Sequence, residues 1–491
     1  MDPITRKASI RETLTPKFVA EPLRSKLSRS TDPNAIFHVI VELDMTFSGA
    51  RKDAYDIVAA AIATVTFPRT RDAMVRNIDG ATHPYLFASL AQTEIFALVN
   101  NPTARPAMFR MWESTAIHPL TTVSIKTVKS DACHLAFSAS GTDIVWAVLD
   151  SGIDGKHPHF IKNNNLDVPK PLVAESFVPG FDPLADAFGH GTHVAGIIAG
   201  EGAENATAAL QTAGDGTDDV NFRIAPVAGI KGMAPKCKLL SMRVMDDSGT
   251  GDVTALINAL ERINQYNSYG RKIIIHGVNI SAGYVPDPRW YAIGQTPVCV
   301  QVNLLVRSGV SVVVAAGNTG FTETKPFSED EHLNLVTRDP SYAAEFGTIN
   351  DPGNAQLAIT VGSTHREKPH AYGVSFFSSR GPTIDGRLKP DVLAPGERII
   401  SCATGRNVTT VMEANPAVTA SDFAYVEDSG TSMSAPHVSG ILASFLSVRR
   451  EFIGDSETLR DMVIATALDL KRDARAQGAG LIDALRLFTD S

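Results

Sequence analysis

The pattern of hydrophobic and polar positions changes near Asp143. From there on, short continuous hydrophobic runs that end in Gly, Asp or Asn alternate with longer segments of helical spacing. Runs of this kind are typical of strands buried on both faces of a parallel sheet. The sequence therefore predicts an α/β fold, a three-layer doubly wound parallel sheet whose ligand lies at the carboxyl ends of the strands. The runs are Ile144–Leu149, Leu239–Val244, Ile273–Ile280, Val310–Ala316 and Leu357–Val361.

The first 125 residues follow a different pattern. Residues 1–33 lack a hydrophobic period, so we expect a flexible arm there. Residues 34–125 are expected to hold a small α+β domain of split-βαβ type and a linker, ahead of a larger domain over residues 126–491. The expected elements of the small domain follow the order strand, helix, strand, strand, helix, strand. They lie near residues 35–47, 51–65, 73–77, 84–90, 92–99 and 108–112.

Composition narrows the class of protein. The chain has 491 residues, of which 44% are hydrophobic and 20% are charged, as in a soluble globular protein. Its net charge of -8 argues against a general nucleic-acid-binding protein, which needs a basic surface. The N-terminal segment has no apolar stretch like that of a secretory signal, and no apolar run is long enough to span a bilayer. We therefore expect a cytoplasmic protein, although a leader already removed from a mature chain would leave the same pattern.

The four cysteines are spread along the chain without a Cys-x-x-Cys pair. This spacing favours neither a zinc knuckle nor a dense disulfide framework, so four free thiols are expected. They are Cys133, Cys237, Cys299 and Cys402.

Two of the expected strands lead directly into polar residues. Asp150 follows the first run, and Asn318 follows the run that ends at Ala316. Each is also explained as an ordinary turn residue. Between them in sequence, His190 and His193 stand beside glycines, but a zinc site would need a third ligand that this neighbourhood lacks. The carboxyl edge of the sheet is therefore expected to gather a carboxylate and an amide from distant parts of the chain.

A serine flanked by small residues precedes a hydrophobic run near the C-terminus. Pro436 fits the first turn of a helix, where backbone N–H groups have no intrahelical acceptor to lose. The N–H of Ser432 would then lie at the positive end of the helix dipole, where it could stabilise an oxyanion. Taken alone, the stretch is equally typical of a helix N-cap.

In the order Asp, His, Asn, Ser, these segments resemble the subtilisin-like serine proteases, or subtilases. The resemblance covers about residues 143–484 and includes two scaffold segments, Ser375–Pro382 and Lys389–Gly396. It implies a serine endopeptidase that cleaves protein or peptide substrates through an acyl-enzyme intermediate. The four segments that carry the chemistry are Val148–Asp154, His190–Gly196, Ala315–Asn318 and Gly430–Pro436.

The resemblance also implies a role for each of these residues. Ser432 would be the nucleophile, His190 the general base, and Asp150 the carboxylate that orients the imidazole. Asn318 would form the oxyanion hole together with the Ser432 N–H. His193 is expected to belong to the scaffold.

The resemblance also implies which residues bind the substrate. Small side chains on two facing walls of a specificity pocket leave room for a sizeable uncharged residue, and a third segment would pair with an extended peptide. The polar segment 202–226 is expected to be an exposed loop near His190, and acidic residues in the insertion 319–348 leave a preference for basic residues open. The walls are Ser281, Ala282, Gly283 and Ala315, Ala316, Gly317, and the pairing segment holds Ser248, Gly249 and Thr250.

No cofactor is expected. His159 stands where calcium-dependent subtilases commonly carry an aspartate, so a calcium site of that type lacks support. The small N-terminal domain resembles the inhibitory propeptide of the family, which implies an intramolecular inhibitor and a zymogen that cuts itself between residues 112 and 127. A docking domain is the alternative. For the whole chain, a transpeptidase or macrocyclase and an inactive binding module are the alternatives to a protease.

Overall fold

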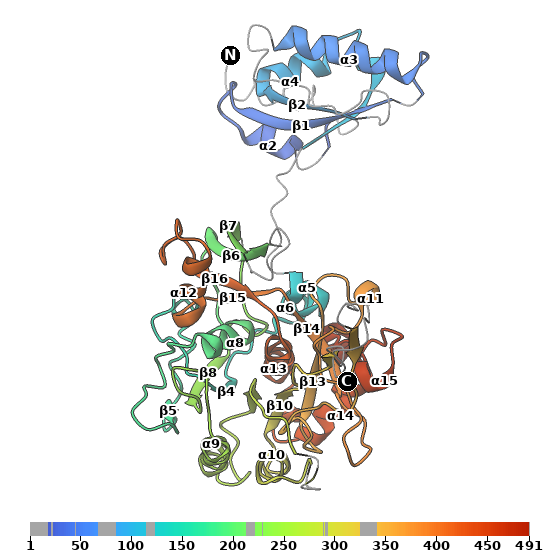
Figure 1. Ribbon diagram of the computed structural model, residues 1–491. Helices are drawn as coiled ribbons and strands as arrows, with labels where there is room; N and C mark the ends of the chain where they lie inside the picture. Colours follow the sequence, from blue (N-terminus) through green and yellow to red (C-terminus); the bar gives the residue numbers. More distant parts are fainter. Residues whose placement is uncertain are drawn as a thin grey trace, which may run out of the picture. The chain divides into compact units, whose positions relative to one another are not determined.

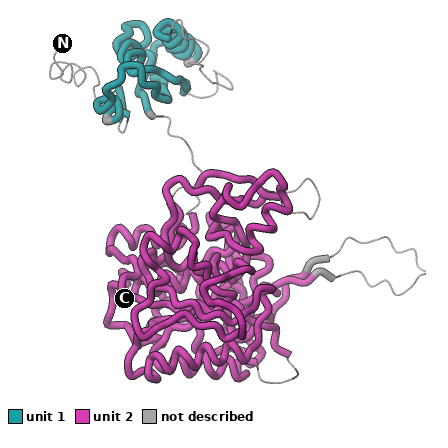
Figure 2. Tube along the Cα trace, turned by 90° about the vertical axis from the view of Figure 1, so that its left-hand side faces the viewer, with its two compact units in different colours: residues 1–117 teal, residues 118–491 magenta. Residues whose placement is uncertain are grey.

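The computed structural model describes residues 18–20, 23–44, 46–66, 85–113, 123–212, 221–227, 229–287, 289, 293–324 and 341–490. Contacts divide the chain into two compact units, residues 1–117 and 118–491, which are coloured separately in Figure 2. Each unit is described by itself. Within the described ranges, no helix combines the length and the hydrophobicity that a membrane crossing requires.

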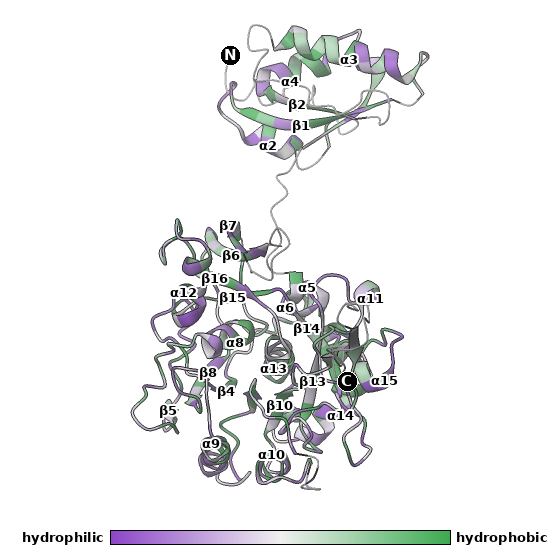
Figure 3. Cartoon of the chain, in the orientation of Figure 1, coloured by the Kyte–Doolittle hydropathy of each residue, from purple (hydrophilic) through white to green (hydrophobic). Residues whose placement is uncertain are grey.

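The N-terminal unit is a three-stranded antiparallel sheet with helices on one face. The strand order is β2-β1-β3, and both pairings of β1 are antiparallel. Val39, Val41 and Leu43 alternate along β1 into the core. In Figure 3, α3 carries both hydrophobic and hydrophilic segments, as expected of a helix that covers a core. The elements are α2 (Leu23–Arg29), β1 (Ile36–Leu43), α3 (Arg51–Val65), β2 (Tyr85–Ala91), α4 (Gln92–Val99), η1 (Arg105–Ala107) and β3 (Met108–Glu113).

Part of the expected flexible arm is ordered. Residues 23–29 form helix α2, and neither Leu23 nor Leu27 is exposed. The two leucines are four residues apart, so they lie on the same face of the helix and both enter the core of the unit. A helix of two turns is too short to give a hydrophobic period in the sequence. The strand expected near residues 73–77 lies outside the described residues.

The C-terminal unit is built on a seven-stranded parallel sheet, which confirms the predicted doubly wound fold. The strand order is β14-β13-β10-β9-β4-β8-β5, and every pairing in this sheet is parallel. The first strand, β4, lies between β8 and β9. Strands β5 and β8 therefore extend the sheet on one side of β4, and strands β9, β10, β13 and β14 extend it on the other. The strands are β4 (Val145–Asp150), β5 (Glu175–Ser176), β8 (Lys238–Arg243), β9 (Gly277–Ile280), β10 (Ser311–Ala315), β13 (Ile359–His365) and β14 (Val392–Glu397).

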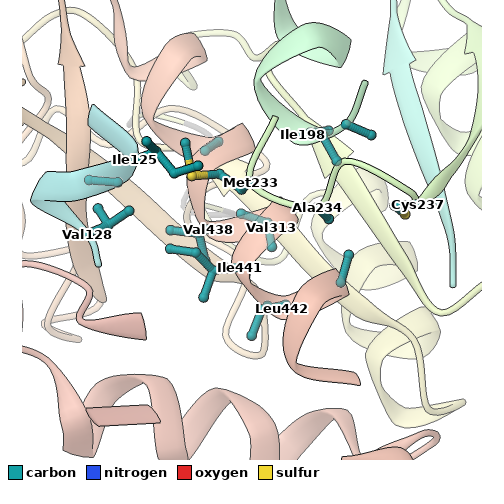
Figure 4. Close-up of a cluster of buried hydrophobic side chains, with 14 of the residues drawn as sticks. Ile125, Val128, Ile198, Met233, Ala234, Cys237, Val313, Val438, Ile441 and Leu442 are labelled. Atoms are coloured by element: carbon teal, nitrogen blue, oxygen red, sulfur yellow. The ribbon is translucent and has the colours of Figure 1, made fainter. Parts of the chain in front are cut away.

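Helices cover both faces of this sheet, as Figure 1 shows. α8 (His190–Ile198) and α13 (Thr431–Val448) lie on one face, and α9 (Val253–Tyr266) and α10 (Pro297–Arg307) lie on the other. Val313 of β10 enters the first core, part of which Figure 4 shows, whereas its neighbours Val312 and Val314 enter the second. Shorter helices complete the unit. They are α5 (Val123–Thr127), α6 (Ser130–Phe137), α7 (Pro158–Ile161), α11 (Pro369–Tyr372), α12 (Gly405–Ala414), η3 (Arg450–Phe452), α14 (Ser456–Thr466), α15 (Ala474–Gln477) and α16 (Ala484–Thr489).

The two long insertions form hairpins. Residues 202–226, expected as an exposed loop, contain β6 (Ala206–Thr212) and most of β7 (Asn221–Val227). These strands extend a second sheet of order β15-β16-β6-β7, together with β15 (Ile399–Cys402) and β16 (Tyr425–Asp428). The second insertion forms the antiparallel pair β11 (Phe321–Thr324) and β12 (Ser341–Ala344). Its acidic residues 329–331 lie outside the described residues.

Candidate active site

The carboxyl end of β4 carries a buried carboxylate that holds an imidazole. Asp150 is the last residue of β4 and is 1% exposed. Its Oδ1 accepts a hydrogen bond from Nδ1 of His190, the first residue of α8, with the two atoms 2.8 Å apart. Because an ionised carboxylate only accepts hydrogen bonds, Nδ1 carries the proton and Nε2 of a neutral His190 is left as an acceptor.

A second buried carboxylate fastens the start of α8. Oδ1 of Asp186 accepts from the Gly189 N–H at 2.7 Å, and Oδ2 accepts from the N–H and the hydroxyl of Thr192 at 2.8 and 2.6 Å. The Ser151 hydroxyl also donates to Asp186, at 2.9 Å, and lies 3.3 Å from Oδ1 of Asp150. Burial raises the pKa of Asp186 above its ordinary value. The sequence analysis missed this residue, although an acid just before a helix start is a usual capping signal.

The charge around His190 decides its protonation. Burial lowers the pKa of His190, but the Asp150 carboxylate more than offsets this effect, and Asp428 and Asp186 act in the same direction. The net result raises the pKa of His190 to about 9. The imidazole is therefore a strong base that Asp150 holds in one tautomer.

Ser432 lies in the first turn of α13, and its neighbour across the site is Ser281. The Ser432 hydroxyl donates to the backbone carbonyl of Ser281 at 3.1 Å, and the Ser281 hydroxyl donates to the backbone carbonyl of Ser432 at 2.9 Å. Among the described residues, no hydrogen bond joins Ser432 to His190. Both residues line the same cavity.

The side-chain amide of Asn318 has a fixed orientation. Its Oδ1 accepts from the Thr431 N–H at 2.9 Å and from the Thr431 hydroxyl at 3.0 Å. The oxygen position follows from these donors, so the NH2 group of Asn318 must point away from Thr431 and remains a donor for the cavity. Thr431 also accepts from the Gly317 N–H at 3.1 Å, and thus links the end of β10 to the start of α13. Thr431 had no role in the sequence analysis.

These groups surround one cavity of about 420 Å³. Six of the expected substrate-binding residues line it, whereas Ala316, Ser248 and Thr250 do not. Ala316 is fully buried, and Ser248 and Thr250 belong to a turn closed on Oδ1 of Asp246. The lining residues are Phe188, His190, Met245, Gly249, Ser281, Ala282, Gly283, Ala315, Gly317, Asn318, Thr319, Asn350, Thr431 and Ser432.

Phe188 and Asn350 line the cavity, although neither residue had a role in the sequence analysis. A side chain added at Gly249 would meet the Phe188 ring at 2.4 Å, so the ring lies directly against this glycine. Gly249 has a φ of +78°, which favours glycine in any case. Asn350 reaches the cavity from the segment after the second insertion, and its place depends on the whole fold.

Within the part of the chain that the structure describes, no group of three or more His, Cys, Asp or Glu side chains is placed to hold a metal ion. The expectation that no cofactor is bound stays a prediction.

Comparisons with known proteins agree with this architecture. The model of the subtilase family matches residues 141–480, well over half of the chain. The chain is similar to the serine protease AprX of Bacillus subtilis, with 28% identity over 351 residues that cover 70% of this chain and 66% of AprX. It is also similar to pyrolysin of Pyrococcus furiosus, with 31% identity over 284 residues that cover 53% of this chain and 18% of pyrolysin. The chain thus spans less than two thirds of either relative's length.

A solved structure, Sphericase, is also similar, with 23% sequence identity and a TM-score of 0.48 over 70% of this chain and 92% of that chain. The family match itself includes the carboxyl ends of β4 and β10 and the starts of α8 and α13. The chain therefore belongs to the subtilase family of subtilisin-like serine proteases.

Proposed function

We propose that the protein is a serine endopeptidase in which Asp150, His190 and Ser432 form the catalytic triad. The observation that carries the proposal is the 2.8 Å hydrogen bond between Asp150 and His190, beside a cavity that His190 shares with Ser432. The serine N–H lies in the first turn of α13, where it has no intrahelical acceptor. A nucleophile, a base, an orienting carboxylate and oxyanion donors are therefore available at one place.

The chemistry follows from this geometry. Oγ of Ser432 attacks the carbonyl carbon of the scissile peptide bond while Nε2 of His190 takes the hydroxyl proton. The negative oxygen of the tetrahedral intermediate accepts from the Ser432 N–H and from Nδ2 of Asn318. The imidazolium then gives its proton to the leaving amine, and the C–N bond breaks. A water molecule, deprotonated by His190, hydrolyses the acyl-enzyme in the same manner.

The cavity favours protein or peptide substrates with an uncharged side chain before the scissile bond. The residues on its walls are small or neutral, and His190 is the one titratable side chain among the lining residues within the described part of the chain. Asn350 and Thr319 add neutral hydrogen-bonding groups to it. A peptide library measures this preference. Cleavage after basic residues, and not after uncharged ones, would contradict it.

The proposal includes the N-terminal unit as an intramolecular inhibitor. Even-numbered residues of β1 face away from the helices, and the same face carries hydrophobic side chains that remain exposed: Ile36 by 46%, Tyr85 by 38% and Trp112 by 36%. An exposed hydrophobic sheet face of this kind is typical of a protein-binding surface. This face supports the proposal that the N-terminal unit binds the surface of another folded domain.

The flanks of the linker narrow the expected cleavage site. β3 extends to Glu113, and α5 begins at Val123 and buries Ile125 in the core of the C-terminal unit. Because residues held in a strand or a helix resist cleavage, the cut expected between residues 112 and 127 should fall outside β3 and α5. Intact mass spectrometry should show two chains for the wild type and one for Ser432→Ala. Identical uncut chains in both would contradict the zymogen.

Labelling with a fluorophosphonate tests the central proposal. The full-length wild type should be labelled at Ser432 and should cleave peptides with release of a hydrolysed carboxylate, and Ser432→Ala should do neither. Cyclised or ligated products would identify a transpeptidase instead. A folded wild type that is neither labelled nor active would identify a binding module.

A further inference from the structure

The backbone carbonyl of Ser432 lacks its usual helical partner. In an α-helix this carbonyl would accept from the N–H four residues later, but that residue is Pro436, which has no N–H. The Ser281 hydroxyl takes this place and donates to the carbonyl at 2.9 Å. The residue that carries the nucleophile is therefore held from the side, by a strand end, and not by its own helix.

The Ser281 hydroxyl is itself held by a buried amide. Nδ2 of Asn279 donates to Oγ of Ser281 at 2.9 Å, and Oδ1 of Asn279 accepts from Oγ of Ser439 at 2.9 Å. Asn279 and Ser439 are not exposed, and Ser281 is 4% exposed. Asn279 lies in β9 between the apolar Val278 and Ile280, where an uncompensated amide would be costly.

The three hydrogen bonds form a closed path. It leaves α13 at Ser439, crosses to β9 through Asn279, and returns to α13 at the Ser432 carbonyl, which lies seven residues earlier on the same face of the helix. Each donor in the path is neutral. All three hydrogen bonds run in the same donor-to-acceptor direction, from Ser439 toward Ser432. Because the start of α13 and the end of β9 are joined in this way, a change at Ser439 alters the restraint on Ser432.

We infer that Asn279 and Ser439 are positioning residues for the nucleophile, which act through the Ser281 hydroxyl to fix the Ser432 backbone relative to the substrate wall. This inference rests on the proposed role of Ser432. Neither residue lines the cavity, so neither is expected to touch the substrate. Because none of the groups in the path titrates near neutral pH, their loss should change the geometry of attack and leave the proton affinity of His190 unchanged.

The test compares buried serines on the same helix. Ser439→Ala removes the first donor of the path, whereas Ser444→Ala removes a hydroxyl that is also buried, at 1% exposure, and that donates to the Met233 carbonyl at 2.8 Å, outside the path. Both are made in the full-length chain, together with Asn279→Ala and the double variant Asn279→Ala/Ser439→Ala. The measurements are kcat and KM on a peptide substrate, the pH profile of kcat/KM, and the rate of fluorophosphonate labelling.

We expect kcat and the labelling rate to fall about tenfold in Ser439→Ala and about a hundredfold in Asn279→Ala, with KM and the pH midpoint nearly unchanged. The double variant should match Asn279→Ala, because the path is already broken there. Ser444→Ala should keep wild-type kcat. If Asn279→Ala does not fold, Ser439→Ala decides the question alone.

Wild-type kcat in Ser439→Ala, or an equal loss in Ser439→Ala and Ser444→Ala, overturns the inference and leaves the proposed protease intact. A shifted pH midpoint in Ser439→Ala also overturns it, because the effect would then run through His190. A wild type that is neither labelled nor active overturns the proposed function, and the inference falls with it.

Discussion

The two sides of the active site are held by different kinds of interaction. On the side of α8, buried carboxylates hold the imidazole: Asp150 bonds His190 directly, and Asp186 caps the helix that carries it. On the side of α13, neutral hydroxyls and amides hold the serine, through Ser281 and Asn279. In the proposed mechanism, one side therefore controls the protonation of His190, and the other controls the position of Ser432.

This difference has a physical reason. A general base needs a tuned proton affinity, which nearby charges provide because they act over several ångströms in a poorly solvated site. A nucleophile needs a fixed location, which short hydrogen bonds between neutral groups provide at any pH. Substitutions on the two sides should thus be separable by pH dependence as well as by the size of the loss.

The largest expected effect is that of Asp150→Asn. The amide removes the negative charge and favours the wrong tautomer of His190, so kcat near neutral pH should fall about 10⁴-fold, a loss of the size that other Ser-His-Asp triads show. The midpoint of the pH profile should also move to lower pH, because the Asp150 carboxylate is what raises the pKa of His190 against the effect of burial. Steady-state kinetics from pH 5 to pH 10 measure both. An unchanged midpoint would show that another group titrates.

The next effect concerns the neutral side of the site. Asn318→Ala removes the side-chain donor of the oxyanion hole, and kcat should fall about a hundred- to a thousandfold, as subtilisin shows for its oxyanion asparagine. The pH midpoint should stay in place. Asn350→Ala is a matched control, since Asn350 lines the same cavity without a proposed role in the oxyanion hole. It should alter KM and the preferred substrate residue, with kcat on the best substrate largely retained.

The sequence was sufficient for the residues whose place depends on local rules. Asp150 and Asn318 follow buried hydrophobic strands, and parallel strands bring their carboxyl ends to one edge. Ser432 was expected at a helix start and lies there, but Pro436, expected in the first turn, is the sixth residue of α13, because the helix already begins at Thr431. The parallel sheet followed from the buried hydrophobic runs, but its strand order could not be read from them.

The residues that could not be predicted depend on contacts between distant segments. The helix cap that Asp186 forms is local, but its contact with the Ser151 hydroxyl, 35 positions away in sequence, is not. In the sequence, Asn279 is a single polar residue inside a predicted strand. Its role depends on the hydrogen bond from Ser439, which lies 160 positions later. Phe188 and Asn350 line the cavity because of loop conformations that no local period encodes. Such contacts are visible in tertiary structure alone.

The wild type should show the pH dependence that the charged side imposes. With the pKa of His190 at about 9, the neutral imidazole is scarce at pH 7, and kcat/KM should rise about fifty-fold between pH 7 and pH 9. The same shift affects stability with the opposite trend. The pKa of His190 is higher in the folded than in the unfolded state, so its protonation stabilises the fold fully below about pH 6.5, and this contribution is lost as the pH rises through 9.

Denaturant unfolding of Ser432→Ala between pH 6 and pH 10 measures the stability term without self-digestion. Asp150→Asn in the same background should flatten the curve. A kcat/KM that is already constant above pH 7 would mean that the carboxylates do not govern the imidazole.

The smallest expected effect is that of Asp186→Asn. This variant gives the most direct test of whether the α8 side and the α13 side act independently. Asp186→Asn turns an acceptor of several hydrogen bonds into a group with one NH2, which must face a donor, so the free energy of unfolding should fall by about 1–3 kcal/mol. Removing its negative charge should also lower the pKa of His190, which Asp186 helps to raise, and should move the pH midpoint down. Asp182→Asn is the control, because Asp182 lies in the same segment and its side chain accepts from the Leu184 N–H at an exposed position. If Asp186→Asn shifts the midpoint while Ser439→Ala does not, charge and position are controlled separately. If both variants shift it, the two sides are coupled through the start of α13 and the division between them fails.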